Sequence, residues 1–161
     1  MAGDMTVACD GGLINLRVGA IIIRDGKFLM VGDRQHDYLY SVGGRIKFGE
    51  TAEEAVVREV EEETGVRLRV DRLGFVHENY FINDTSPNQG RLVYEVSFYF
   101  YMEVPEDFEP ACASFTEDGN EEFLAWAAAD EPRTIFPGFF REELKRPETT
   151  IRHFVTDERG S

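Results

Sequence analysis

The sequence predicts an α/β fold, organised as a single domain over residues 1–161. Three observations favour this fold class. The chain has 161 residues, 42% of them hydrophobic, which suffices for one apolar core. Aliphatic and aromatic segments of strand length recur along it without repeats or low-complexity tracts. Between them, residues 51–65 combine helical spacing with signals for a helix start and a helix end.

The first third of the chain predicts three strands. Val18–Ile23 and Phe28–Val31 are aliphatic and are separated by Arg24-Asp25-Gly26, a composition typical of a hairpin turn. Tyr38–Val42 is a third short strand. It leads into Gly43-Gly44, which we interpret as a tight turn where the backbone can approach a ligand closely.

A helix is predicted directly after this turn. Thr51 and Glu54 have the spacing of a capping box, so the helix should begin at Ala52. Gly65 can adopt the left-handed conformation of a helix C-cap. An aliphatic stripe on one side of the helix should pack on the core. The stripe consists of Val56, Val57 and Val60.

The second half predicts more strands. Leu68–Phe81 contains one or two strands, and Arg91–Val104 alternates as a long strand paired back onto them. Asn83–Gly90 between them is dense in turn formers and should be an exposed loop. An acidic loop follows at Pro105–Asn120, and then a strand at Phe123–Ala127.

The C-terminal part predicts a second helix and an edge strand. The helix lies within Pro132–Lys145, from about Gly138 to Arg146. Ile151–Val155 has the composition of an edge strand. The ends of the chain, about residues 1–12 and 156–161, are expected to be flexible.

The predicted helix carries three acids that point to a metal site. Glu59, Glu62 and Glu63 lie within roughly a third of the helix circumference. Like charges this close repel each other, and a divalent cation would relieve the repulsion. Carboxylate oxygens suit hard ions such as Mg²⁺ or Mn²⁺. Arg58 is expected to pair with Glu54 and Glu62. The alternative interpretation is an ordinary solvated acidic helix.

The segment Gly44–Val66, GRIKFGETAEEAVVREVEEETGV, resembles the Nudix box, the signature of hydrolases acting on nucleoside diphosphates linked to another group. The resemblance extends more loosely over about Arg17–Ala128, and it implies an α/β/α sandwich with a mixed β-sheet. Nine specified positions match: Gly44, Glu50, Arg58, Glu59, Val60, Glu62, Glu63, Gly65 and Val66.

The resemblance also implies residue roles. Glu59, Glu62 and Glu63 would bind Mg²⁺ or Mn²⁺ together with the carbonyl of Gly43. Arg58, Glu59 and Glu63 form the expected catalytic set, with Glu59 as the first candidate for the general base and Arg58 orienting a glutamate. A base from outside the box remains an alternative. Candidate substrate-binding residues are Arg34, Gly44, Arg45, Glu50, Glu95, Glu121 and Glu122.

Several of these candidates have two interpretations. Glu121 and Glu122 either supply the extra carboxylate or form a solvated strand end. Glu95 points either into the site or into solvent. Arg34 either contacts phosphate or is exposed loop polarity. Glu50 either braces the segment before the helix or holds metal indirectly.

Charge and composition limit the partners. The formal net charge of −14 and the lack of a clustered basic patch argue against long nucleic acid as a ligand. A small phosphorylated nucleotide-type substrate remains compatible, because metal ions can supply positive charge. The longest aliphatic run is too short to span a bilayer, so we expect no membrane partner and a cytoplasmic location. Cys9 and Cys112 match no metal spacing.

The resemblance leaves the substrate open between a nucleoside triphosphate, oxidised forms included, and a nucleoside diphosphate sugar such as ADP-ribose. Ile82 stands where many ADP-ribose hydrolases carry a proline, which argues against that class. The resemblance also raises a homodimer as a candidate assembly. The alternative function is a Nudix-fold nucleotide-binding or regulatory module without turnover.

Overall fold

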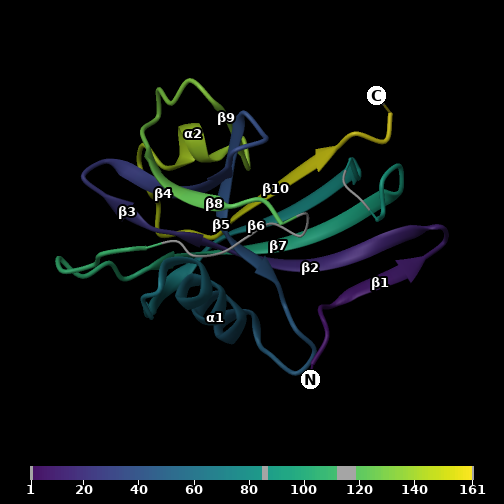
Figure 1. The fold of residues 1–161 in the computed structure, drawn as a ribbon, viewed down its shortest axis with the longest axis horizontal. Coiled ribbons are helices and arrows are strands. Elements are labelled where there is room, and N and C mark those ends of the chain that lie inside the picture. Colours follow the sequence, from purple (N-terminus) through teal and green to yellow (C-terminus); the bar gives the residue numbers. More distant parts are fainter. Residues whose placement is uncertain (1, 85–86, 112–118, 161) are drawn as a thin grey trace.

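The computed structural model describes residues 2–84, 87–111 and 119–160, and a ten-stranded mixed sheet dominates it (Figure 1). The strands are β1 (Thr6–Cys9), β2 (Gly12–Ile21), β3 (Ile23–Arg24), β4 (Lys27–Asp33), β5 (Tyr38–Arg45), β6 (Val70–Ile82), β7 (Leu92–Met102), β8 (Glu122–Ala127), β9 (Thr134–Phe136) and β10 (Arg152–Asp157). The main path of the sheet is β10-β6-β7-β2-β5-β4-β3. Strand β1 pairs with β2, β8 with β4, and β9 with β5.

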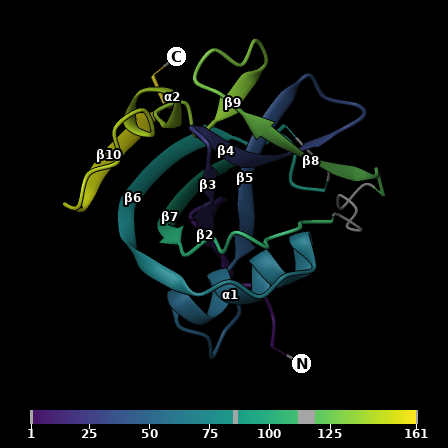
Figure 2. The same ribbon diagram turned by 90° about the vertical axis from the view of Figure 1, so that its left-hand side faces the viewer.

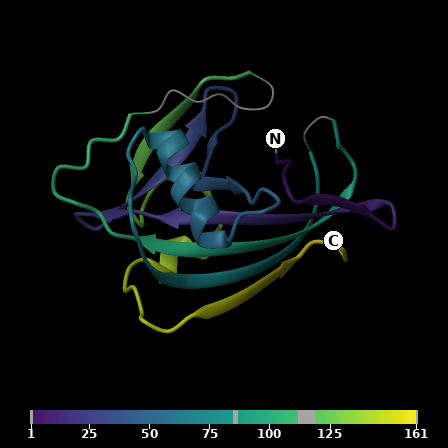
Figure 3. The ribbon, with the colours of Figure 1, turned by 90° about the horizontal axis from the view of Figure 1, so that it is seen from below.

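Two helices lie on opposite sides of this sheet, as Figures 1 and 2 show. Helix α1 (Ala52–Thr64) lies across the strands on one face (Figure 3), and the short helix α2 (Phe140–Glu143) lies on the other. The predicted α/β class with a mixed sheet is confirmed. Over the described residues, neither helix has the length and apolarity needed to cross a membrane.

Helix α1 begins and ends where the sequence predicts. The Oγ1 of Thr51 accepts a hydrogen bond from the Glu54 N–H at 3.2 Å, and the Thr51 N–H donates back to the Glu54 carboxylate at 3.4 Å. Gly65 closes the helix at φ 76°. Val56 and Val60 are fully buried against the sheet. The caps and the aliphatic stripe therefore determine both the length of α1 and the face that it packs on the core.

Apolar clusters form on both faces of the sheet because neighbouring residues of a strand point to opposite faces. On the α1 side, Val18 and Val42 join Phe100. On the α2 side, Phe75 and Tyr99 surround Phe140. Strand β5 is thus packed on both faces, and it holds the residues that precede α1 in place.

The predicted turn at Gly43-Gly44 is wrong, because both glycines lie inside β5. They pair with β2 in the register Gly19↔Gly43 and Val18↔Gly44. A Cβ atom on Gly43 would lie 2.1 Å from the carbonyl oxygen of Val18. The glycines therefore serve the close approach of β5 to β2 and α1, rather than a change of chain direction.

The second helix is much shorter than the predicted Gly138–Arg146 segment, and β9 precedes it where no strand was expected. Phe140 is drawn into the aromatic cluster on the α2 side of the sheet. The turn after the helix stops before Pro147, whose ring disfavours a helical residue in front of it.

Strands occur in both ends of the chain that were expected to be flexible. Strand β1 lies within residues 1–12 and pairs with β2 from Thr6 to Cys9. The predicted edge strand is confirmed as β10, which pairs in parallel with β6 and continues to Asp157. Backbone pairing with a long neighbouring strand orders these segments although they are largely exposed.

The predicted strand Val18–Ile23 is correct only in part, because β2 already begins at Gly12 and ends at Ile21, and Ile23 belongs to the separate strand β3. The other elements follow the prediction. The hairpin turn lies at Asp25 and Gly26, with φ of 51° and 74°. Strands β6 and β7 pair antiparallel along most of their length, and β8 is the strand around Trp126. The described parts of the two predicted loops, 83–84, 87–90, 105–111 and 119–120, contain no helix or strand. Cys112 lies outside the described residues, and Cys9 is an exposed free thiol.

Candidate functional site

The box helix brings a buried carboxylate against strand β5. The Gly43 N–H donates to Glu63 Oε2 at 3.0 Å, and Glu63 is only 9% exposed. Burial, together with the negative charges of Glu59 and Glu122, raises the pKa of Glu63 to about 8 against the opposing effect of the Gly43 hydrogen bond. Three carboxylates from α1 and β8 therefore act on one another at this point.

The carboxylate of Glu59 lies directly over the backbone of Gly44. A Cβ atom on Gly44 would lie 2.4 Å from both Cδ and Oε1 of Glu59. Burial raises the pKa of Glu59, and the hydrogen bond from Arg58 opposes the rise. The absence of a side chain at position 44 thus makes room for a partly desolvated carboxylate.

Arg58 is the centre of the ionic network at the box. Its guanidinium donates to both oxygens of Glu50, at 2.5 and 3.0 Å. Its Nη1 donates to Glu59 at 2.8 Å and to Glu62 at 3.3 Å, and its Nη2 donates to the carbonyl of Arg45 at 3.1 Å. The Glu50 contact holds the pKa of that carboxyl below its usual value. Arg58 therefore links the segment after β5 to the acidic edge of α1.

The expected partners of Arg58 are only half correct. The pair with Glu62 is confirmed, and the pair with Glu54 is wrong. Glu54 is engaged in the capping box with Thr51, and Arg58 extends toward Glu50 instead. The capping geometry and the Arg58 network thus use different carboxylates of the same segment.

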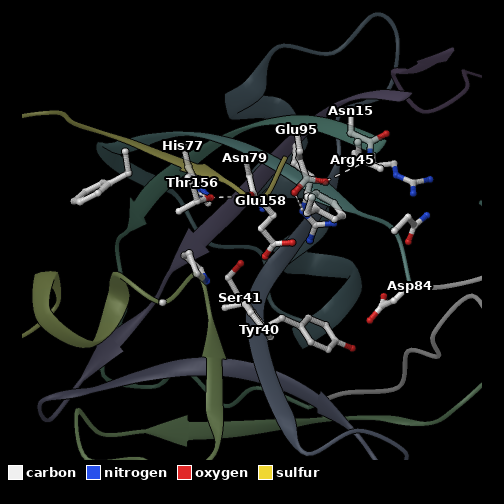
Figure 4. A pocket seen from close by; sticks show the side chains of 18 of the residues that line it. Asn15, Tyr40, Ser41, Arg45, His77, Asn79, Asp84, Glu95, Thr156 and Glu158 are labelled. Carbon is white, nitrogen blue, oxygen red and sulfur yellow. Dashed lines mark hydrogen bonds and ion pairs between the residues drawn. The ribbon is translucent and has the colours of Figure 1, made fainter. Parts of the chain in front are cut away.

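A cavity of about 600 Å³ lies beside this network (Figure 4). It lies over β2, β6 and β7, on the same face of the sheet as α2. Arg17 of β2 lies where the cavity meets the acidic residues of the box. Its Nε is 4.0 Å from Glu95 Oε1, and its positive charge lowers the pKa values of Glu59 and Glu63 against the dominant effect of burial. Arg17 connects the box acids electrostatically to the cavity.

Arg17 is not among the residues that the sequence pattern singled out as site candidates. The signal was present, since an arginine stands near the start of the otherwise apolar segment Leu16–Ile23. Charged residues inside apolar strands are seldom buried without a specific partner. Asn15 and Asn79, which also line the cavity, gave no comparable signal because polar strand residues usually face solvent.

The candidate substrate-binding residues separate into two groups. Gly44, Arg45, Glu50 and Glu95 lie at the box or the cavity, and Arg45 and Glu95 line the cavity directly. Glu95 therefore points into the site rather than into solvent.

A second group lies on the other side of β5. Arg34 and Glu121 form an ion pair at 3.5 Å with side chains 80% and 63% exposed, and neither lines the cavity. Glu122, the next residue, accepts a hydrogen bond from the hydroxyl of Tyr40, which does line the cavity. Of the two candidate carboxylates outside the box, Glu122 is the one whose charge acts on Glu63.

The chain matches the family model of the NUDIX domain over residues 14–147. The chain belongs to the Nudix family. It is 38% identical over 61 residues to a MutT-like protein of Streptomyces ambofaciens, covering 38% of this chain and 40% of that protein. It is 33% identical over 90 residues to an ADP-ribose pyrophosphatase of Methanocaldococcus jannaschii, covering 54% and 49%. The chain thus spans less than half the length of either curated relative.

Among solved structures, the chain resembles a MutT NUDIX hydrolase from Burkholderia pseudomallei with a TM-score of 0.53. The two are 26% identical, and the match covers 73% of this chain and 85% of that one. The family and the fold therefore agree with the resemblance drawn from Gly44–Val66.

Gly43 and Gly44, the two adjacent glycines of β5, should respond differently to alanine. In Gly43→Ala the new Cβ would meet the backbone of Val18, which cannot move aside, so we expect a loss of about 1–3 kcal/mol in the free energy of unfolding. In Gly44→Ala the Cβ would meet the Glu59 side chain, so we expect a folded protein with a displaced carboxylate and at least about a tenfold loss of activity.

Urea denaturation and phosphate-release assays would measure both effects. Gly3→Ala is the matched control, because a Cβ there meets no atom within 4 Å. A Gly44→Ala protein with full activity would show that the position of the Glu59 carboxylate is unimportant.

Proposed function

We propose that this protein hydrolyses the pyrophosphate bond of a small nucleotide-type substrate in a reaction that depends on a divalent metal ion. One observation carries the proposal. Arg17 lines a cavity large enough for a nucleoside, and its charge also acts on the partly buried Glu59 and the buried Glu63.

The acidic residues have the chemistry that Mg²⁺ or Mn²⁺ requires. All donors are oxygens, and Glu63 and Glu122 have no ion pair within 4 Å among the described residues. Glu59 and Glu62 share the single positive charge of Arg58 with Glu50, so it offsets their charge only in part. Within the described part of the chain, no three acidic, histidine or cysteine side chains are already arranged to hold a metal ion. Glu59, Glu62 and Glu63, with the Gly43 carbonyl, would hold the ion. Arg58 would release Glu62 and keep its contact with Glu59 Oε1.

A bound divalent ion neutralises phosphate charge and lowers the pKa of a coordinated water. The protein's own groups then have separate tasks. Glu59 is positioned as the general base by Arg58, which Glu50 anchors. Arg17 and Arg45 supply positive charge where the cavity meets the box, and so would orient the phosphate groups. Glu122 is the alternative base, held by the Tyr40 hydroxyl.

The metal requirement is the direct test. We expect Mg²⁺ or Mn²⁺ to support phosphate or pyrophosphate release from a panel of nucleoside triphosphates and nucleoside diphosphate sugars. Calcium should bind without supporting fast turnover, because its larger and more variable coordination shell orients reactants less strictly. Full turnover in excess chelator would overturn the proposal. Nucleotide binding with no turnover under any metal would instead favour a binding or regulatory module.

A further inference from the structure

The cavity floor carries a row of polar side chains that four neighbouring strands contribute. Thr156 of β10 pairs with Asn79 of β6, Asn79 pairs with Glu95 of β7, and Glu95 pairs with Asn15 of β2. Residues in register across a sheet point to the same face. All four line the cavity, as Figure 4 shows, and we call them the polar row.

A second row lies one pleat nearer to the box. His77, Ser97, Arg17 and Arg45 follow one another in register across β6, β7, β2 and β5. This row supplies two arginines, whereas the polar row supplies an acid and amides. Phosphates would meet the arginine row, which leaves the polar row for the other end of a nucleotide.

The orientation of the Asn79 amide is determined by its neighbours. The Thr156 hydroxyl donates to Asn79 Oδ1 at 2.6 Å, and His77 Nε2 lies 2.9 Å from the same hydroxyl oxygen. Burial lowers the pKa of His77 to about 4, so the ring is neutral at pH 7. Because Thr156 gives its only proton to Asn79, His77 donates to Thr156. The Asn79 Nδ2 amino group is therefore the part of this amide that remains to donate to a ligand.

The carboxylate beside Asn79 keeps most of its accepting capacity. Glu95 has two contacts among the described residues, both long: Asn15 Nδ2 at 3.4 Å and Arg17 Nε at 4.0 Å. A carboxylate has about four acceptor positions. Its side chain is only 17% exposed, so the unmet capacity belongs to a largely buried carboxylate at the cavity. The polar row thus presents one donor next to two acceptor oxygens.

Aromatic rings form the other walls of the cavity, among them those of Tyr38, Phe81 and Phe139. Flat apolar walls suit a planar ring system better than a sugar with hydroxyl groups on both faces. The edge of that ring should carry one acceptor next to two donors, the complement of the donor and two acceptors of Asn79 and Glu95.

We propose that the cavity selects guanine as the base of the substrate, with Glu95 accepting from N1–H and the 2-amino group and Asn79 donating to O6. This inference rests on the proposed function for the identity of the ligand as a nucleotide. Adenine presents an amino group to the Asn79 donor and an unprotonated ring nitrogen to the Glu95 acceptor. Uracil presents a single N–H between two acceptors. Both would leave buried polar groups without partners.

The test compares bases at constant phosphate chemistry. We expect kcat/KM with Mg²⁺ to be higher for GTP than for ITP, which lacks only the 2-amino group, by roughly tenfold or more. It should exceed that for ATP by roughly a hundredfold. Calorimetric binding of GMP, IMP and AMP in excess chelator gives the same comparison without any turnover.

Glu95→Gln removes one of the two acceptors, so the preference for GTP over ITP should fall toward one. Glu78→Gln is the matched control, because Glu78 lies on the opposite face of β6 and accepts from Tyr94 and His153. Equal rates and affinities for the three bases, or a preference that Glu95→Gln leaves unchanged, would overturn the guanine assignment alone. Selective GMP binding without hydrolysis of any nucleotide would overturn the proposed function and support the base selection.

Discussion

Glu63→Gln is expected to lower turnover by about two to three orders of magnitude while the protein remains folded. The amide keeps an oxygen that can accept from the Gly43 N–H, so the contact between α1 and β5 persists. It removes the charge that a bound metal ion needs, so the metal concentration for half-maximal activity should also rise. Rates measured over a Mn²⁺ titration would give both quantities.

The same variant should change how stability depends on pH. The pKa of Glu63 is about 8 in the folded protein and near the ordinary value of 4.5 in the unfolded chain. Below pH 4.5 both states hold the proton, and the residue costs nothing. Between these values the unfolded chain ionises first, so the free energy of unfolding of the wild type falls as pH rises toward 8. The variant lacks this loss and should be the more stable protein at pH 8.

Urea denaturation at several pH values in excess chelator would test this dependence. Glu61→Gln is a suitable control on the same helix, because Glu61 is exposed and its carboxylate pairs with Arg67 at the surface. A Glu63→Gln protein that unfolds more easily at every pH, while its folded fraction retains full activity, would assign Glu63 a structural role.

If Glu59 acts as the general base and not mainly as a metal ligand, Glu59→Gln should reduce the maximal rate by a comparable factor, about two to three orders of magnitude, with a nearly unchanged metal requirement. A base acts as the proton leaves, whereas a ligand contributes affinity for the ion. Arg58 and Gly44 hold the Glu59 carboxylate in place, and the glutamine retains its size. Rates over a Mn²⁺ titration, compared with those of Glu62→Gln and Glu63→Gln, would separate the two roles.

A changed metal requirement in Glu59→Gln would point to a different general base. If Glu59→Gln shifts the metal requirement as far as Glu63→Gln and the pH–rate profile keeps its acidic limb, the base lies outside the box. Glu122→Gln is then the next variant, because Glu122 is near enough to raise the pKa of Glu63. Glu121→Gln becomes its control, since Glu121 pairs with Arg34 at the surface.

Local signals in the sequence predicted the elements that depend on neighbouring residues. The capping box at Thr51, the C-cap at Gly65 and the hairpin turn at Asp25-Gly26 all occur as expected. Each depends on hydrogen bonds or backbone angles within a few residues. The predicted length of the second helix was too great. Packing of Phe140 into the aromatic cluster outweighs the helix propensity of the residues around it.

By itself, the sequence determined the family and the order of acids along α1, because one contiguous motif contains both. It also determined the mixed α/β class, because strand-length apolar segments alternate with a helical segment along the chain. Only the tertiary structure decided that Gly43 and Gly44 belong to a strand, that Arg17 borders the acids, and that Glu95 shares a row with Asn79. The partners in each case come from different strands. Strand register depends on packing on both faces of the sheet at once, and no local pattern specifies it.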